Sequence, residues 1–143
     1  MILPDVNVLI YAFDEESPRH SEYAQWLERA VNDPEDIALF DPVLSGFVRI
    51  VTHPRVFTHP APTPVALSFV TALVNSHSAR WLRSSPEMWN ALSSFVDDDD
   101  KIKGNMVPDA LIAAAAVVHG AKIATADRGF SRFPGVISFD PAR

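Results

Sequence analysis

The sequence predicts an α/β domain in which helices cover both faces of a central parallel sheet. Short apolar runs, such as residues 2–4 and 37–40, alternate with longer segments whose apolar residues recur at helical spacing. This alternation is typical of parallel strands that are buried on both faces. The length of 143 residues, with 48% hydrophobic and 21% charged residues, predicts one globular domain over residues 1–143.

The strands are predicted from five short apolar runs, each bounded by polar or turn-forming residues. The first run stops at Pro4, and Asp5 follows it directly. The predicted strands cover residues 2–4, 37–40, 79–82, 122–125 and 136–139.

The helices are predicted from apolar residues at three- and four-residue spacing and from proline at helix starts. The second helix is expected to open at Ser17 or Pro18, and prolines between residues 52 and 64 exclude a continuous helix there. Residues 106–119 give the strongest helical pattern, apolar nearly all round, which predicts burial. Gly120 is expected to end that helix. The predicted helices cover residues 8–13, 18–31, 42–51, 65–74, 86–96 and 106–119, and residues 130–135 are expected to form a loop.

Composition limits the class of protein. The chain has no cysteine, which excludes disulfides and thiolate metal sites and fits a cytoplasmic protein. The N-terminus has no signal-peptide pattern, and the longest apolar run, residues 110–118, is too short to span a bilayer. The net charge of −6 argues against general nucleic-acid binding through a basic surface, although metal ions at an acidic site can recruit phosphates.

Three aspartates interrupt apolar segments near the ends of predicted elements. Asp5 ends the first strand, Asp127 follows the strand at 122–125, and Asp109 lies in the first turn of the most apolar helix. Taken singly, each has an ordinary structural role as a turn or cap residue. Taken together, they are expected to meet at the carboxyl edge of the sheet, where open α/β sheets place their sites. Three ionised carboxylates in one pocket need a cation, and Mg²⁺ or Mn²⁺ suits such oxygen ligands.

Three sequence segments resemble PIN-domain ribonucleases, and specifically the VapC toxins of bacterial toxin–antitoxin pairs. The segments are 5–11 (DVNVLIY), 105–114 (NMVPDALIAA) and 125–130 (TADRGF), and residues 47–57 resemble a mycobacterial subgroup. The resemblance implies a three-layer α/β/α sandwich, metal-dependent cleavage of RNA, a VapB-type antitoxin partner and a homodimer.

The resemblance also assigns roles to individual residues. It implies that Asp5, Asp109 and Asp127 are the metal-binding catalytic acids, and that Asn7 and Thr125 support them. The family pattern departs at two places, where Gly46 and Gly129 stand at positions that often carry acids. These departures put a second metal in doubt, and Asp41 is a weak candidate to replace the missing acid.

RNA binding is assigned to arginines near these motifs. Arg49, Arg55, Arg128 and Arg132 are expected to contact the RNA backbone, although each has an equally ordinary interpretation as a surface charge. A metal-bound water as nucleophile predicts 5′-phosphate and 3′-hydroxyl products.

Other residues of the chain allow different interpretations. His53, His59, His77 and His119 match no compact zinc signature, and the acidic run 97–100 lacks the spacing of a calcium loop, so a solvated loop is expected there. Trp26, Trp81 and Trp89 have spacings typical of core residues. Two alternatives to the enzyme stay open: a catalytically weak PIN domain that mainly binds RNA or its antitoxin, and a Mg²⁺-binding receiver-like domain.

Overall fold

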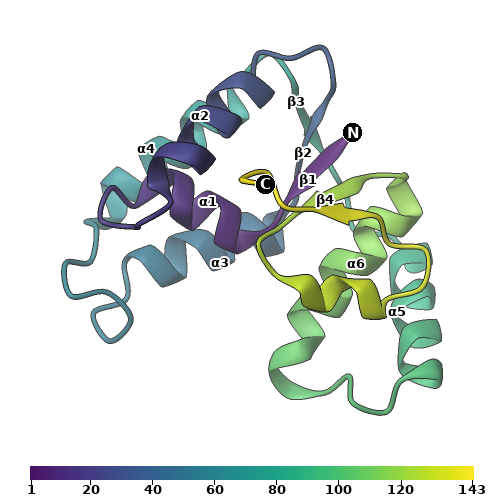
Figure 1. Cartoon of the computed structure of the whole chain (residues 1–143). Helices are drawn as coiled ribbons and strands as arrows, with labels where there is room; N and C mark the ends of the chain where they lie inside the picture. The colour runs from purple at the N-terminus through teal and green to yellow at the C-terminus, as the bar shows by residue number, and fades with distance from the viewer.

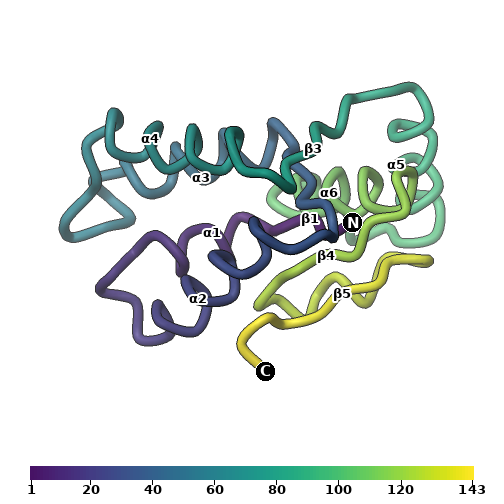
Figure 2. The backbone as a smooth tube through the Cα atoms, turned by 90° about the horizontal axis from the view of Figure 1, so that it is seen from above, coloured from purple at the N-terminus to yellow at the C-terminus, as the bar shows by residue number.

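The computed structural model describes residues 1–143 and contains one five-stranded sheet in which all neighbouring strands are parallel. The strand order is β3-β2-β1-β4-β5, which places β1 at the centre (Figure 2). Four of the five predicted strands are confirmed to within one residue, and the last is shorter than predicted. The strands are β1 (Ile2–Pro4), β2 (Ile37–Leu39), β3 (Ala79–Trp81), β4 (Lys122–Ala124) and β5 (Ser138–Phe139).

Helices cover both faces of this sheet. The chain moves outward from β1 to β3 through α1–α4 and returns to β4 through α5 and α6, so right-handed crossovers place the two groups on opposite faces. Figure 1 shows α1–α4 on one side of the strands and α5 and α6 on the other. The predicted α/β/α sandwich is therefore confirmed. The helices are α1 (Val6–Phe13), α2 (His20–Ala30), α3 (Asp41–Val51), α4 (Thr63–Val74), α5 (Pro86–Asp98) and α6 (Val107–His119), with 3-10 helices η1 (Gly104–Met106) and η2 (Arg128–Arg132).

The core is a cluster of 32 buried apolar residues that includes residues of both helix groups and of the sheet. The helix α6 contributes four consecutive alanines, residues 113–116, all fully buried. Such small side chains let a helix backbone approach its neighbours closely, which explains why this segment is apolar nearly all round. Gly120 ends α6 with φ +67°, a conformation that glycine adopts without steric cost.

Several expected details are wrong, each for a local reason. The helix α2 begins at His20, because the Ser17 N–H donates to the Asp14 carbonyl and closes a turn. Part of the expected loop at 130–135 belongs to the 3-10 helix η2, because the Asp127 side chain caps that helix. Residues 97 and 98 form the last turn of α5 and not a loop.

Two of the three tryptophans are not core residues. Trp81 is 51% exposed because β3 is an edge strand, and Trp89 is 59% exposed because it lies beside the buried stripe of α5. Trp26 is partly buried and its ring packs edge-on against Phe139, with centroids 6.2 Å apart. The expectation that all three belong to the core is therefore wrong for Trp81 and Trp89.

The carboxyl ends of the strands meet along one edge of the sheet. The Asp5 N–H donates to the Ala124 carbonyl at 2.9 Å, and the Thr125 N–H donates to the Phe139 carbonyl at 2.9 Å. These bonds place the residues that follow β1, β4 and β5 next to one another. No helix of the chain combines the length and the apolar character needed to cross a membrane.

Candidate active site

Asp5 is a buried carboxylate with three hydrogen-bond donors. It is 5% exposed, directly follows β1 and caps the N-terminus of α1. Its Oδ1 accepts from the Val6 N–H at 2.7 Å, and its Oδ2 accepts from the Asn7 Nδ2 at 2.9 Å and the Thr125 Oγ1 at 2.7 Å. Because each of these donors favours the ionised form, they offset part of the cost of burying the charge.

Asn7 and Thr125 join the ends of β1 and β4 through the same network. Asn7 Oδ1 accepts from the Ala126 N–H at 3.1 Å, and its Nδ2 lies 3.3 Å from Thr125 Oγ1. Thr125 Oγ1 also accepts from the Asp127 N–H at 3.0 Å. Together the two side chains hold the Asp5 carboxylate in fixed relation to the backbone of Ala126 and Asp127.

Asp127 and Asp109 come from two further segments. Asp127 caps η2, and its Oδ1 accepts from the Gly129 N–H at 2.7 Å. Asp109 is an intermediate-exposure residue in the first turn of α6, where the helix dipole favours an anion. Neither side chain is paired with a cation in the chain.

The three carboxylates interact electrostatically. Burial, followed by the charges of Asp5 and Asp127, raises the pKa of Asp109 from 3.8 to about 6. Burial also raises the pKa of Asp5, and the charge of Asp127 adds to that rise. The hydrogen bonds from Thr125, Val6 and Asn7 lower this pKa and offset only part of the rise. Like charges near one another disfavour ionisation, so a cation in this pocket would be bound favourably.

All three carboxylates line one open cavity of about 650 Å³. Residues of α1, α3 and α6 form its walls, and the predicted motifs at 5–11 and 105–114 both contribute to it. Arg49 is the basic residue of its lining. The cavity is thus acidic at its base and carries one cationic group from α3.

The donor chemistry of this cavity fits a hard divalent cation. No group of three His, Cys, Asp or Glu side chains is spaced to hold one metal ion directly. Mg²⁺ commonly binds one or two protein carboxylates and keeps several waters, so three repelling carboxylates around a cavity fit that mode of binding. The residues present therefore fit a cation that retains water ligands.

The two glycines at family acid positions lie close to this machinery. Gly46 lines the cavity, and a Cβ atom there would lie 3.3 Å from Val6 Cγ2. A Cβ atom at Gly129 would lie 3.1 Å from Asp127 Oδ1. An acid at either position would need its neighbour to shift slightly. Asp41 lines a different hollow and does not replace the missing acid in this cavity.

Of the other three predicted arginines, two line hollows beside the carboxylates and one does not. Arg132 lines a hollow of about 360 Å³ together with Asp109 and Asp127, and Arg128 lines a hollow of about 340 Å³ on another side of Asp127. Arg55 is exposed beyond the end of α3 and lines none of these cavities. The structure brings three of the four arginines to the carboxylates.

Ser45 and Asn105 line the cavity but were not among the predicted site residues. Each precedes a predicted site residue by four positions, Ser45 before Arg49 and Asn105 before Asp109. Residues four apart lie on one face of a helix, so this spacing identifies Ser45, which shares α3 with Arg49. Asn105 lies in η1, before α6 begins, so helical spacing does not identify it.

The family model described as PIN domain matches residues 2–136. This chain is a PIN-domain protein. It is also 42% identical to "VapC ribonuclease Mb2897" of Mycobacterium bovis, over 93% of this chain and 90% of that protein. The chain therefore belongs to the VapC ribonucleases, and the predicted family and the predicted enzyme class are confirmed. The receiver-like alternative is excluded.

Solved structures agree with this fold. The chain superposes with a TM-score of 0.72 on VapBC2 from Rickettsia felis bound to a DNA fragment from its promoter, with 20% identity and 98% of both chains covered. It superposes with a TM-score of 0.68 on VapC20 of Mycobacterium tuberculosis, described as a toxin that cleaves the sarcin-ricin loop, with 17% identity and 96% and 99% of the chains covered.

Proposed function

We propose that this VapC-family PIN domain is the toxin of a toxin–antitoxin pair and hydrolyses RNA phosphodiesters with Mg²⁺, or with Mn²⁺ in its place. The observation that carries the proposal is that Asp5, Asp109 and Asp127, from three distant segments, line one cavity. Their charges also interact, because those of Asp5 and Asp127 raise the pKa of Asp109 and that of Asp127 raises the pKa of Asp5. When bound, the cation would neutralise charge on the phosphate and activate a water. Hydrolysis of this kind leaves 5′-phosphate and 3′-hydroxyl ends.

The chain's own residues would keep the carboxylates ionised and oriented. The hydroxyl of Thr125 and the amide of Asn7 both donate to Asp5, which favours its charged form against the burial that raises its pKa. The Gly129 N–H donates to Asp127 Oδ1 and so helps to orient that carboxylate. Asp109 has no such donor, so its protonation state depends most strongly on the cation and on pH.

Arginines around the cavity would hold the RNA backbone. Arg49 lies inside the cavity, and Arg128 and Arg132 lie in hollows that share Asp127. Their guanidinium groups can bind phosphate oxygens through paired hydrogen bonds. Arg55 would contact RNA only if the substrate extends past the end of α3.

Cleavage of total cellular RNA with Mg²⁺ or with EDTA tests the proposal. The Asp5→Asn and Asp109→Asn variants should lose metal-dependent cleavage, whereas Asp97→Asn, an exposed acid on α5, should behave as the wild type. Analysis of the product ends should show 5′-phosphates. Equal cleavage by all variants, with and without the metal, would contradict the assignment.

The partners proposed for this chain are a VapB-type antitoxin and a second copy of the chain, in the cytoplasm. Solved neighbours of this fold include a VapBC assembly, which supports an antitoxin partner. For the homodimer, helix α4 offers two half-exposed apolar side chains, Val65 and Leu67. Size-exclusion chromatography with light scattering of the chain alone and with the co-expressed antitoxin tests both partners.

A second candidate is a catalytically weak domain that mainly binds RNA or its antitoxin. Gly46 and Gly129 leave three acids in the site, and no three of the chain's ligating side chains form a direct metal group. RNA binding without cleavage at saturating Mn²⁺ would favour this candidate over the enzyme.

A further inference from the structure

We propose that a hollow beside the carboxyl ends of β2 and β3 is a nucleotide subsite, in which Trp81 stacks on a base of the RNA and Arg83 binds its phosphate. This inference rests on the proposed ribonuclease function and names a binding site outside the carboxylate cavity. The hollow has a volume of about 410 Å³, and six residues line it: Phe40, Asp41, Trp81, Leu82, Arg83 and Ser84.

Trp81 presents a large apolar surface to solvent at this place. Trp81 is 51% exposed. Because the indole ring is large and apolar, covering it with a ligand would be favourable. The aromatic pairs within the fold do not include Trp81, so its ring faces are not used by another aromatic residue. An exposed aromatic ring beside a hollow is the arrangement on which single-stranded bases stack.

Arg83 and Asp41 give the hollow its polar groups. Arg83, just after β3, is exposed and forms no ion pair within the chain, whereas Arg80, on β3, pairs with Asp36. A free guanidinium two residues after the tryptophan can bind a phosphate oxygen. The Asp41 carboxylate can accept a hydrogen bond from the amino group of a base.

The hollow adjoins the carboxylate cavity. Leu39 is paired with Trp81, and Ile2 is paired with Ile37, so this register brings Pro4 level with Leu39 and Trp81. Trp81 therefore lies level with Pro4, the residue directly before Asp5. Neighbouring strands are about 4.8 Å apart, so β3 lies about 10 Å from β1, a distance that a short run of single-stranded RNA can span.

Two consecutive residues of the chain connect the two sites. Asp41 lines the hollow, and the next residue, Pro42, lines the carboxylate cavity. RNA bound with its scissile phosphate at the carboxylates would thus reach the hollow with a neighbouring nucleotide. Because the net charge of −6 opposes RNA binding, stacking supplies attraction that does not depend on charge.

Binding of a labelled, mixed-sequence single-stranded RNA of about ten nucleotides tests this subsite. Affinity is measured by fluorescence anisotropy in EDTA at low salt, and quenching of tryptophan fluorescence is recorded in the same titration. Trp81→Ala should weaken binding by about tenfold or more and remove most of the quenching, and Trp81→Phe should retain most of the affinity. Arg83→Gln should weaken binding and lower the salt slope by about one.

Matched controls separate the subsite from general effects. Trp89→Ala removes another exposed tryptophan outside the hollow, and Arg80→Gln removes another arginine of the same segment; both should bind RNA as the wild type does. Equal affinity of Trp81→Ala and the wild type would overturn the proposal and leave the hollow as a surface for a protein partner.

Cleavage in Mg²⁺ separates this inference from the proposed function. Metal-dependent cleavage by the wild type, with unchanged RNA binding in Trp81→Ala, would overturn the subsite alone. RNA binding that depends on Trp81 but never leads to cleavage would support the subsite and contradict the enzyme. In the cleaving enzyme, Trp81→Ala should raise KM by about tenfold and leave kcat nearly unchanged.

Discussion

The hydroxyl of Thr125 lies 2.7 Å from Oδ2 of Asp5, 120 residues away in the chain, and donates a hydrogen bond to it. This contact joins the ends of β1 and β4 at the base of the acidic cavity. It also lowers the pKa of Asp5 against the rise that burial causes.

Replacing Thr125 with valine should raise the pKa of Asp5 further and reduce both stability and activity. Valine keeps the volume but leaves a buried carboxylate without one donor, which costs about 1–3 kcal/mol of unfolding free energy. Activity should fall by about tenfold to a hundredfold, because the carboxylate loses its fixed orientation. Urea unfolding and cleavage kinetics check both effects. Thr125→Ser keeps the hydroxyl and should restore most of the activity; a fully active Thr125→Val would contradict the role of this bond.

The metal-free protein should lose stability from Asp109 as the pH rises from about 4 to 7. The pKa of Asp109 is raised from 3.8 to about 6 in the folded chain, so between these values the folded state holds a proton that the unfolded state has released. Stability falls with pH wherever the folded state binds more protons. Thermal unfolding in EDTA across this range should show the loss in the wild type, reduced in Asp109→Asn. Excess Mg²⁺ should reverse it, and cleavage should rise with pH through about 6.

Introducing glutamate at Gly46 should strengthen metal binding. Gly46 lines the acidic cavity within α3, so a carboxylate there adds a ligand, and removing a glycine from a helix interior favours the helix by about 0.5–1 kcal/mol. The contact of a new Cβ with Val6 Cγ2, at 3.3 Å, opposes part of this gain. The Mg²⁺ concentration that gives half-maximal cleavage should fall several-fold, to roughly a third or less. Gly46→Gln has the same shape without the charge, and an equal effect from it would contradict the explanation.

Removing the Arg132 guanidinium should weaken RNA binding more than turnover. Its Nε donates to Asp99 Oδ2 at 3.1 Å, which anchors the side chain at the rim of the hollow that contains Asp109 and Asp127. Arg132→Gln should raise KM about fivefold, with kcat reduced less than twofold. Asp99→Asn should show a smaller rise in KM because it removes only the anchor. Arg80→Gln, whose arginine pairs with Asp36, is the control and should leave KM unchanged.

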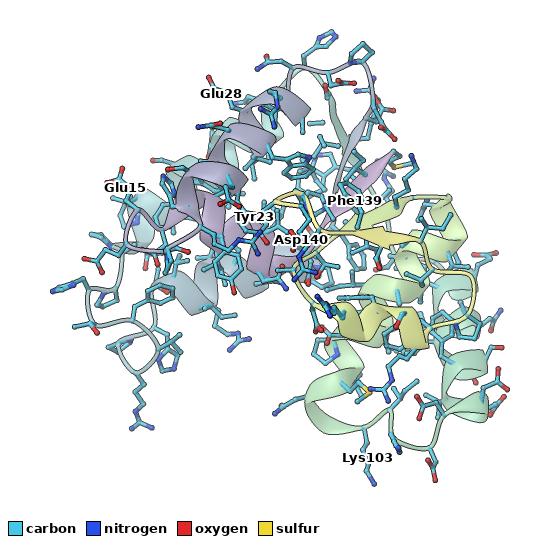
Figure 3. All side chains as sticks on the ribbon, in the orientation of Figure 1. Glu15, Tyr23, Glu28, Lys103, Phe139 and Asp140 are labelled. Atoms are coloured by element: carbon cyan, nitrogen blue, oxygen red, sulfur yellow. The ribbon has the colours of Figure 1, made fainter.

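The C-terminal segment should depend on Tyr23 for stability and not for activity. The fully buried Tyr23 donates from its hydroxyl to Asp140 Oδ1 at 2.8 Å, and Figure 3 shows the two side chains near one another. Burial, followed by the bond to Asp140 and its charge, raises the pKa of Tyr23 to about 12. Tyr23→Phe should lower the unfolding free energy by about 1–2 kcal/mol with unchanged cleavage kinetics. Chemical denaturation measures the first effect, and a loss of activity in the folded variant would contradict this division of roles.

The sequence by itself predicted the α/β/α architecture and the three aspartates that line the cavity. Apolar periodicity located the strands and the buried helix α6, because burial on one or all faces leaves a repeating pattern in the chain. Asp5, Asp109 and Asp127 could be selected because charged groups are costly inside apolar segments unless they serve a local purpose. Family motifs then confirmed the class of enzyme to which such acids belong.

Only the tertiary structure decided what surrounds those acids. That Thr125 donates to Asp5, that Arg132 is anchored by Asp99, and that Asp41 faces a different hollow depend on contacts between segments far apart in the chain. The exposure of Trp81 likewise follows from the position of β3 at the sheet edge, and strand order is not written in local spacing. Periodicity reports whether a residue has a buried side, whereas its neighbours are fixed only when the strands pair and the crossovers close.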